Sequence, residues 1–103
     1  MLFLLNETAT LYRRTGQSAG KPAWANDGIG FQCRTQPYTA QQATAQGYSG
    51  DADTRVYALP DLEAAAGDKI LFDDGSFAIV REVYRRRGMA DLHHLEILGK
   101  RGG

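Results

Sequence analysis

The alternation of apolar and polar residues along the chain predicts short β-strands. The segment GFQCRTQP (residues 30–37) places Phe31 and Cys33 on one side and polar residues on the other, which is typical of a half-buried strand. The segments TATLYRR (residues 8–14) and TRVYAL (residues 54–59) are rich in the β-branched and aromatic residues that strands favour. We therefore expect β-structure in both halves of the chain.

The clearest local signal is a β-hairpin. Residues 69–73 and 76–85 are strands by composition, and the Asp73-Asp74-Gly75 sequence between them is an Asp-Gly turn signal. The second strand should be covered on both sides, because apolar residues occupy both of its faces. The predicted faces consist of Phe77, Ile79 and Val83 on one side, and of Ala78, Val80 and Tyr84 on the other.

The remaining segments complete an all-β domain. Residues 15–22 and 85–88 are predicted turns, residues 92–98 a further strand, and residues 99–103 a flexible tail. One short helical turn is expected over residues 60–66, where Gly67 would end it. The pattern predicts a single domain, residues 1–103, folded as a small β-barrel or sandwich of five or six short strands.

Residues 37–53 are expected to form a long exposed polar loop. From Tyr38 to Asp53 the chain has three glutamines and no aliphatic side chain larger than alanine, so this stretch cannot form a core of its own. Loops of this length in compact domains are often functional. We therefore treat this loop as a candidate functional segment.

The acidic and basic residues are unevenly distributed along the chain. The 103-residue chain has a net charge of zero, but residues 51–74 contain seven acids and two bases, and residues 81–103 contain six bases and three acids. One acidic and one basic region suit head-to-tail contacts between copies, although two unrelated solvated faces would give the same counts. The candidate contact residues are Arg85, Arg86, Arg87, Asp61 and Glu63.

No residue pattern indicates catalysis, a metal or a cofactor. His93 and His94 would point to opposite faces of a strand and cannot share one metal ion. Cys33, the only cysteine, falls in mid-strand where a small buried side chain is usual, and a lone thiol suits a reducing compartment. Asp73 and Asp74 occupy a turn that favours aspartate for backbone reasons. We expect a protein that is not an enzyme.

The second half of the chain resembles the head–tail joining proteins of tailed phages. The resemblance lies in PDLE (residues 60–63), AGDKI (residues 66–70), DGSFAIVREV (residues 74–83) and LHHLEIL (residues 92–98). It covers residues 56–98, and the first half fits only in layout. These motifs are short and chiefly structural.

The resemblance implies a structural protein of the virion neck, made in the cytoplasm of the host bacterium. Such a protein forms a homo-oligomeric ring, a hexamer rather than a dodecamer, between a portal or adaptor protein and a tail terminator or tail tube protein. A stopper of this kind helps to retain packaged double-stranded DNA and offers the tail its attachment site. By position, the long loop would face the DNA channel through Tyr38, Gln41, Gln42, Gln46 and Tyr48.

The sequence leaves two alternative functions open. A tail terminator ring protein would have a similar size and β-content. A non-viral interaction or nucleic-acid-binding module with a small barrel would need basic and aromatic residues interleaved on one sheet face. The bases at residues 85–87 are instead predicted to cluster in a turn. Nothing indicates a membrane protein.

Overall fold

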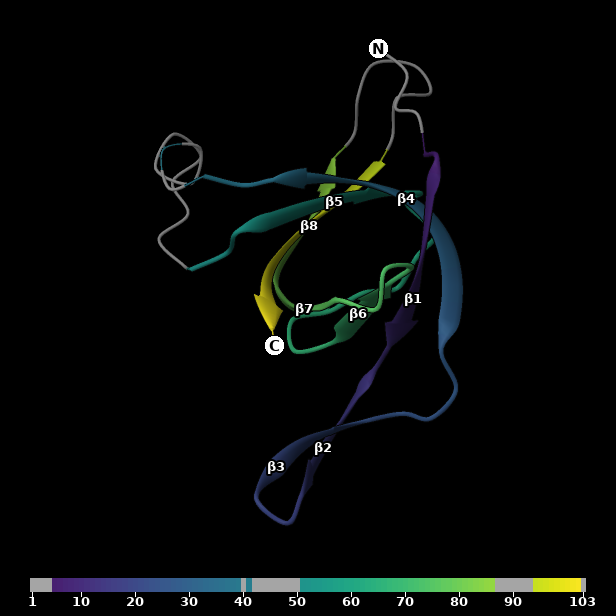
Figure 1. Ribbon diagram of the computed structural model, residues 1–103. Helices are drawn as coiled ribbons and strands as arrows, with labels where there is room; N and C mark the ends of the chain where they lie inside the picture. Colours follow the sequence, from purple (N-terminus) through teal and green to yellow (C-terminus); the bar gives the residue numbers. More distant parts are fainter. Residues whose placement is uncertain (1–4, 40, 42–50, 87–93, 103) are drawn as a thin grey trace.

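The chain folds as a closed six-stranded antiparallel β-barrel with a separate two-stranded hairpin (Figure 1). The computed structural model describes residues 5–39, 41, 51–86 and 94–102. The strands are β1 (Glu7–Tyr12), β2 (Arg14–Ser18), β3 (Lys21–Trp24), β4 (Ile29–Pro37), β5 (Thr54–Ala58), β6 (Lys69–Phe72), β7 (Phe77–Arg86) and β8 (His94–Gly102). The all-β expectation is confirmed, and the barrel replaces the sandwich alternative.

The barrel order is β1-β4-β5-β8-β7-β6, with β6 returning to β1. In Figure 1, β4, β5 and β8 form the upper wall, β6 and β7 the lower wall, and β1 joins them on one side. Closure pairs every barrel strand with two neighbours, so the barrel has no open edge. No helix in the described part of the chain is long and apolar enough to cross a membrane.

The core fills the inside of the barrel with side chains from all six of its strands. Cys33 and Leu11 are fully buried, and Phe31 packs against the same cluster, as the alternation of residues 30–37 predicts. Burial raises the pKa of the Cys33 thiol to about 11, with smaller contributions from the negative charges of Glu7 and Asp73. The buried cluster comprises Ala9, Leu11, Cys33, Val56, Ala58, Leu62, Ile70, Phe72, Ala78, Val80, Leu95 and Ile97.

The predicted hairpin is β6–β7, and a β-bulge in β7 changes its faces. Gly75, with a φ of 88°, lies in the turn, where the Gly75 amide donates to the carbonyl of Phe72 at 3.0 Å. The register with β8 shifts between Val80 and Glu82, so the strand has one extra residue there. Val83 was predicted to share a face with Phe77 and Ile79. Because of the bulge, it instead packs against the barrel core. Arg85 and Arg86 continue the strand, so the turn predicted at residue 85 is wrong.

Two further local predictions are wrong. Residues 60–66 contain turns and irregular chain with no helix, because Leu62 is buried in the barrel core and the segment is too short to form a helix on its own. The predicted flexible tail is strand over residues 99–102, where Gly102 pairs with Phe77 and Gly99 is buried. Residue 103 lies outside the described residues.

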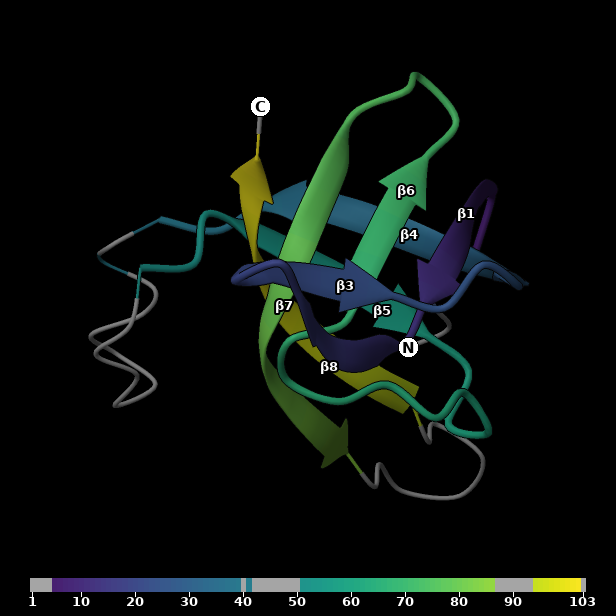
Figure 2. The same cartoon turned by 90° about the horizontal axis from the view of Figure 1, so that it is seen from below.

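The hairpin β2–β3 was predicted as a loop and is a separate sheet. It stands away from the barrel in Figure 1, and Figure 2 shows it in front of the barrel when the molecule is seen from below. The molecule measures 45 × 28 × 23 Å, so its long dimension is well beyond the other two. Within the described residues, β2 and β3 pair only with each other.

Candidate assembly surfaces

The base of the β2–β3 hairpin is tied to the turn that precedes β6. The indole Nε1 of Trp24 donates to the carbonyl of Gly67 at 2.9 Å. Gly67 has a φ of 96°, a conformation that favours glycine, and this turns its carbonyl toward the hairpin. The amide of Arg14 donates to Oδ1 of Asp68 at 2.9 Å. Both strands of the hairpin are therefore fixed at their barrel end.

Asp68 and Lys69 complete this anchor. Asp68 is buried, and its second oxygen accepts from the amide of Ala65 at 3.0 Å, so one carboxylate joins the turn and the hairpin. The Lys69 ammonium lies 4.7 Å from the ring centre of Trp24 and 5.5 Å from that of Tyr12. Such cation–π contacts hold the aromatic base of the hairpin against β6. The hairpin is thus a projecting arm with a defined direction.

The hairpin itself is exposed. Its residues from Arg14 to Pro22 have exposed side chains wherever the structure describes them, and only Ala23 and Trp24 are half-buried. Arg13, just before β2, pairs with Glu63 at 3.0 Å between exposed side chains. This ion pair is open to solvent, so we expect it to contribute little to stability.

A polar groove of about 320 Å³ lies near the other end of β1. Glu7 accepts two hydrogen bonds from Thr35, and Asp73 accepts one from the hydroxyl of Thr8. The hydroxyl and amide of Ser76 both donate to Asp74 and hold the pKa of that carboxyl below its usual value. The groove is lined by Asn6, Glu7, Thr8, Thr35, Phe72, Asp73, Asp74 and Arg101.

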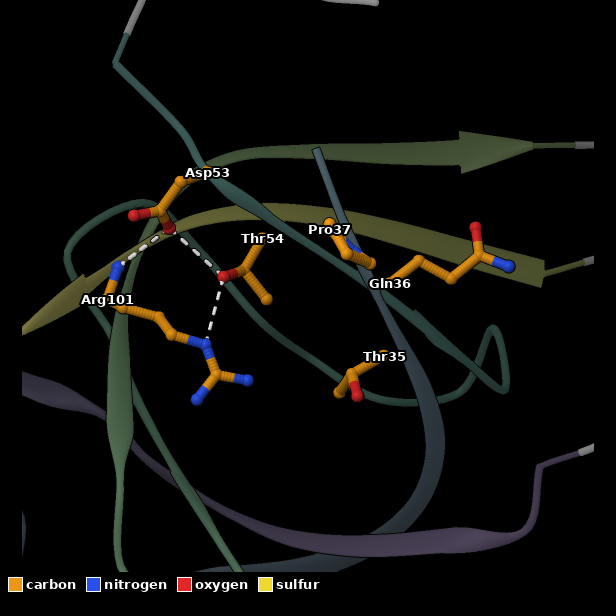
Figure 3. A pocket seen from close by; sticks show the side chains of 6 residues that line it. All are labelled: Thr35, Gln36, Pro37, Asp53, Thr54 and Arg101. Carbon is orange, nitrogen blue, oxygen red and sulfur yellow. Dashed lines mark hydrogen bonds between the residues drawn. The ribbon is translucent and has the colours of Figure 1, made fainter. Parts of the chain in front are cut away.

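A second polar cavity, of about 260 Å³, adjoins this groove and shares Thr35 and Arg101 with it (Figure 3). Asp53 accepts from the Arg101 amide and the Thr54 hydroxyl, each at 3.0 Å. Burial alone would raise the pKa of Asp53, but these hydrogen bonds and the Lys100 charge outweigh it and lower that pKa. Figure 3 shows the Arg101 guanidinium extending into the space that Thr35 borders. Its Nε donates to Thr54 Oγ1 at 3.2 Å.

Three of the five predicted contact residues, Asp61, Glu63 and Arg85, lie in or against the chain between β5 and β6. Nη1 of Arg85 donates to the carbonyl of Pro60 at 2.7 Å. Asp61 lines a shallow cavity of about 240 Å³ together with the exposed Ile29 and Leu59. Glu63 faces the arm through its pair with Arg13. Arg86 lies in β7 opposite His94, and Arg87 lies outside the described residues.

The predicted channel loop is described only at its two ends. Tyr38 is 3% exposed, so its expected position in an exposed loop is wrong. Its ring packs with Leu98 on the outside of the barrel, and the Arg55 guanidinium lies 4.8 Å from the ring centre. Gln41 is exposed. Gln42, Gln46 and Tyr48 lie outside the described residues, as does His93.

Like the β2–β3 arm, a cluster of side chains around Arg55 on the outside of the barrel was not predicted from the sequence. Nη1 of Arg55 donates to the Tyr57 hydroxyl at 2.9 Å, and the ring of Tyr57 meets His94 edge-on with centroids 5.5 Å apart. Burial alone would lower the pKa of Arg55, but Tyr57 and the charge of Glu96 raise it. Alternating Arg55 and Tyr57 in TRVYAL is the only sequence signal for this cluster. The cluster packs on the outer face of β5, next to the end of the loop predicted over residues 37–53.

The described residues contain no group of three or more His, Cys, Asp or Glu side chains arranged to hold a metal ion. A comparison with known protein families finds no family whose model matches the chain, and a comparison with curated proteins finds no significant match.

Proposed function

We propose that this chain is a structural subunit of a tailed-phage virion neck. It forms a homo-oligomeric ring between portal or adaptor and tail, and helps to retain packaged DNA. The single observation that carries the proposal is the anchored, projecting β2–β3 arm, which has no barrel strand paired to it. An arm of this kind suits contact with another subunit, because a lone two-stranded hairpin is marginally stable in water.

Two further features support a structural role. The barrel is small and closed, its interior is filled by side chains, and the cavities described above lie at its surface with mixed polar linings. The segments that carry the phage resemblance also build the arm's anchor, since Gly67, Asp68 and Lys69 each contact the base of the hairpin or the strand before it. The resemblance thus includes residues that fix the base of the arm to the barrel.

Ring formation by the full chain is the direct test. Purified protein at high concentration should give rings of one size by electron microscopy, with one subunit number by native mass spectrometry. Genes for portal, capsid and tail proteins should neighbour the gene for this chain. A chain that never forms rings and is encoded among unrelated genes would contradict the neck proposal.

A DNA-binding measurement separates the neck role from a nucleic-acid-binding module. We expect weak binding of the isolated chain to double-stranded DNA, because acidic residues balance its bases. Tight binding with a steep salt dependence, lost on changing Arg85 to Ala, would favour the binding module.

A further inference from the structure

The edges of the β2–β3 arm are poorly suited to pairing with another strand. Ala19 and Gly20 have φ values of 53° and 78°, so they form a two-residue turn with positive φ at both positions. In such a hairpin the residues next to the turn, Ser18 and Lys21, form the hydrogen-bonded pair, and the next pair directs its amides outward. Pro22 occupies that next position and has no amide to donate.

The other strand carries its own obstacle to pairing. The register shifts between Arg14 and Gly16, so β2 contains a bulge or irregularity, and Gly16 has a φ of 128°. Bulges and prolines are the devices by which natural sheets protect open edges. A partner should therefore meet the side chains of the arm and leave its strand edges unpaired.

The side chains of the arm are basic. Residues 13–24 contain Arg13, Arg14 and Lys21 and no acid. The backbone carbonyl of Gly16 accepts from Nε of Arg14 at 3.4 Å, and Arg13 pairs with Glu63. Lys21 is exposed beside the turn, and within the described residues it forms no ion pair. The tip of the arm thus presents an uncompensated positive charge.

The groove between Glu7 and Asp74 has the complementary charge. It contains three carboxylates and one guanidinium, and the guanidinium of Arg101 is held over the ring of Phe72, 4.7 Å from its centre. The hydrogen bonds from Ser76 stabilise the ionised form of Asp74 and lower its pKa. The groove is therefore an acidic recess open to solvent, and its charge is opposite to that of the arm's tip.

The two surfaces lie at opposite ends of one strand. The arm leaves β1 at Tyr12, which pairs with Lys69, whereas the groove lies toward Glu7, where β6 ends at Phe72 and Asp73 follows. A six-residue strand spans about 17 Å, and Figure 1 shows the arm pointing away from the barrel. The arm and groove of one subunit therefore cannot meet, whereas those of two copies can.

We propose that the β2–β3 arm of one copy docks by its basic tip in the groove of Glu7, Asp73 and Asp74 on the next copy. The inference rests on the proposed function, because it names the contact by which copies associate. Such a contact joins two different surfaces, and repeating it closes a ring when the rotation between copies allows closure. Complementary charge also fixes the direction of association.

Charge reversal with mixing tests this contact. Sedimentation of the full-length wild type at 50 mM salt should show concentration-dependent assembly. Lys21→Glu alone, and Asp73→Lys alone, should each weaken association at least tenfold. Mixed in equal amounts, the two variants should assemble again, because residue 21 of each arm then faces a residue of opposite charge at position 73 of the next copy. Restoration by mixing is a result that damage to folding cannot produce.

Two controls keep the result interpretable. Arg81→Glu makes the same change of charge at an exposed position of β7, where it removes a solvent-exposed ion pair with Asp51, and should leave assembly unchanged. Asp74→Asn removes a charge from the groove while its amide oxygen can still accept from Ser76, so it should weaken assembly without disturbing the turn. Circular dichroism should show every variant folded.

The outcomes separate this inference from the neck proposal. Rings that form equally well with Lys21→Glu would overturn the arm–groove contact and leave the neck role standing. A wild type that stays monomeric at every concentration would also overturn the contact, and gene neighbours then decide the neck role. Assembly lost in each single variant and recovered in the mixture establishes the contact.

Discussion

The barrel and the β2–β3 arm are both antiparallel sheets, but they are stabilised in different ways. In the barrel, β7 pairs with β6 and with β8, and its Ala78 and Val80 side chains are each 1% exposed. In the arm, each strand has one neighbour, and the side chains described from Arg14 to Pro22 are exposed. The barrel is held by burial of apolar surface, whereas the arm is held by its turn and its anchor.

This difference indicates where sequence is constrained for folding and where it is free for recognition. A barrel position must fit a filled interior, so small changes in volume or polarity are costly. An arm position faces solvent, so its side chain can be selected for a partner. The contrast predicts large effects of substitution in the barrel, intermediate effects at the anchor and small effects near the tip.

The largest expected effect comes from placing a charge in the barrel. Val80→Asp buries a carboxylate among apolar side chains and should cost roughly 4 kcal/mol or more, enough to unfold a small domain. Gln17→Asp places the same side chain on the exposed arm and should change the free energy of unfolding by less than about 0.5 kcal/mol. Urea unfolding of both variants measures the contrast. Equal losses would mean that the arm is not an independent exposed element.

An intermediate effect is expected where the arm meets the barrel. Trp24→Ala removes the hydrogen bond to Gly67 and the ring beneath Lys69, and should cost about 2 kcal/mol in the arm's local stability. Trp24→Phe keeps a ring and loses the hydrogen bond, so its cost should be about 1 kcal/mol. Hydrogen exchange should show faster exchange in β2 and β3, with the barrel amides unchanged. Faster exchange throughout the barrel would show that the arm is part of the same cooperative unit.

The same contrast explains which parts of the fold the sequence predicts. The strand of Phe31 and Cys33 is predicted correctly because it has one buried face and its residues therefore alternate. The β6–β7 hairpin is predicted correctly because an Asp-Gly turn separates two apolar segments. The arm has no buried face, so its polar residues give no alternation, and its Ala19-Gly20 turn lacks the usual Asn or Asp. The sequence therefore indicates a loop where the structure has a hairpin.

Other errors arise from tertiary contacts. The bulge near Arg81 shifts Val83 onto the core face, which a strict two-residue period cannot reveal. The glycines of the predicted tail permit close approach, since a side chain at Gly102 would meet the ring of Phe77 and one at Gly99 would crowd Ile79. Asp61, Glu63 and Arg85 stay predicted contact residues, whereas no pattern in the sequence shows that the arm and the groove lie at opposite ends of β1.

A pH-dependent effect on barrel stability should appear at alkaline pH. In the unfolded chain Cys33 ionises near its ordinary pKa of 9.0, whereas in the folded barrel it stays protonated up to a pKa of about 11. The unfolded state releases this proton first, so stability falls as pH rises from about 9 to 11. Urea unfolding of wild type and Cys33→Ala across that range isolates the thiol from other groups. An identical slope in both proteins would contradict the raised pKa.

The smallest expected effect lies at the tip of the arm. Ala19 has a φ of 53°, a left-handed conformation that costs a residue with a Cβ roughly 1 kcal/mol, whereas asparagine tolerates it and is common before glycine in such turns. Ala19→Asn should therefore stabilise the arm by about 0.5 kcal/mol, and Ala19→Val, which is β-branched, should destabilise it by about 1 kcal/mol. Because the arm can open without the barrel, the changes should appear as slower or faster hydrogen exchange in β2 and β3, with little change in global unfolding. If both variants shift the global midpoint together with the barrel amides, the tip is coupled to the core and the separation of arm from barrel is wrong.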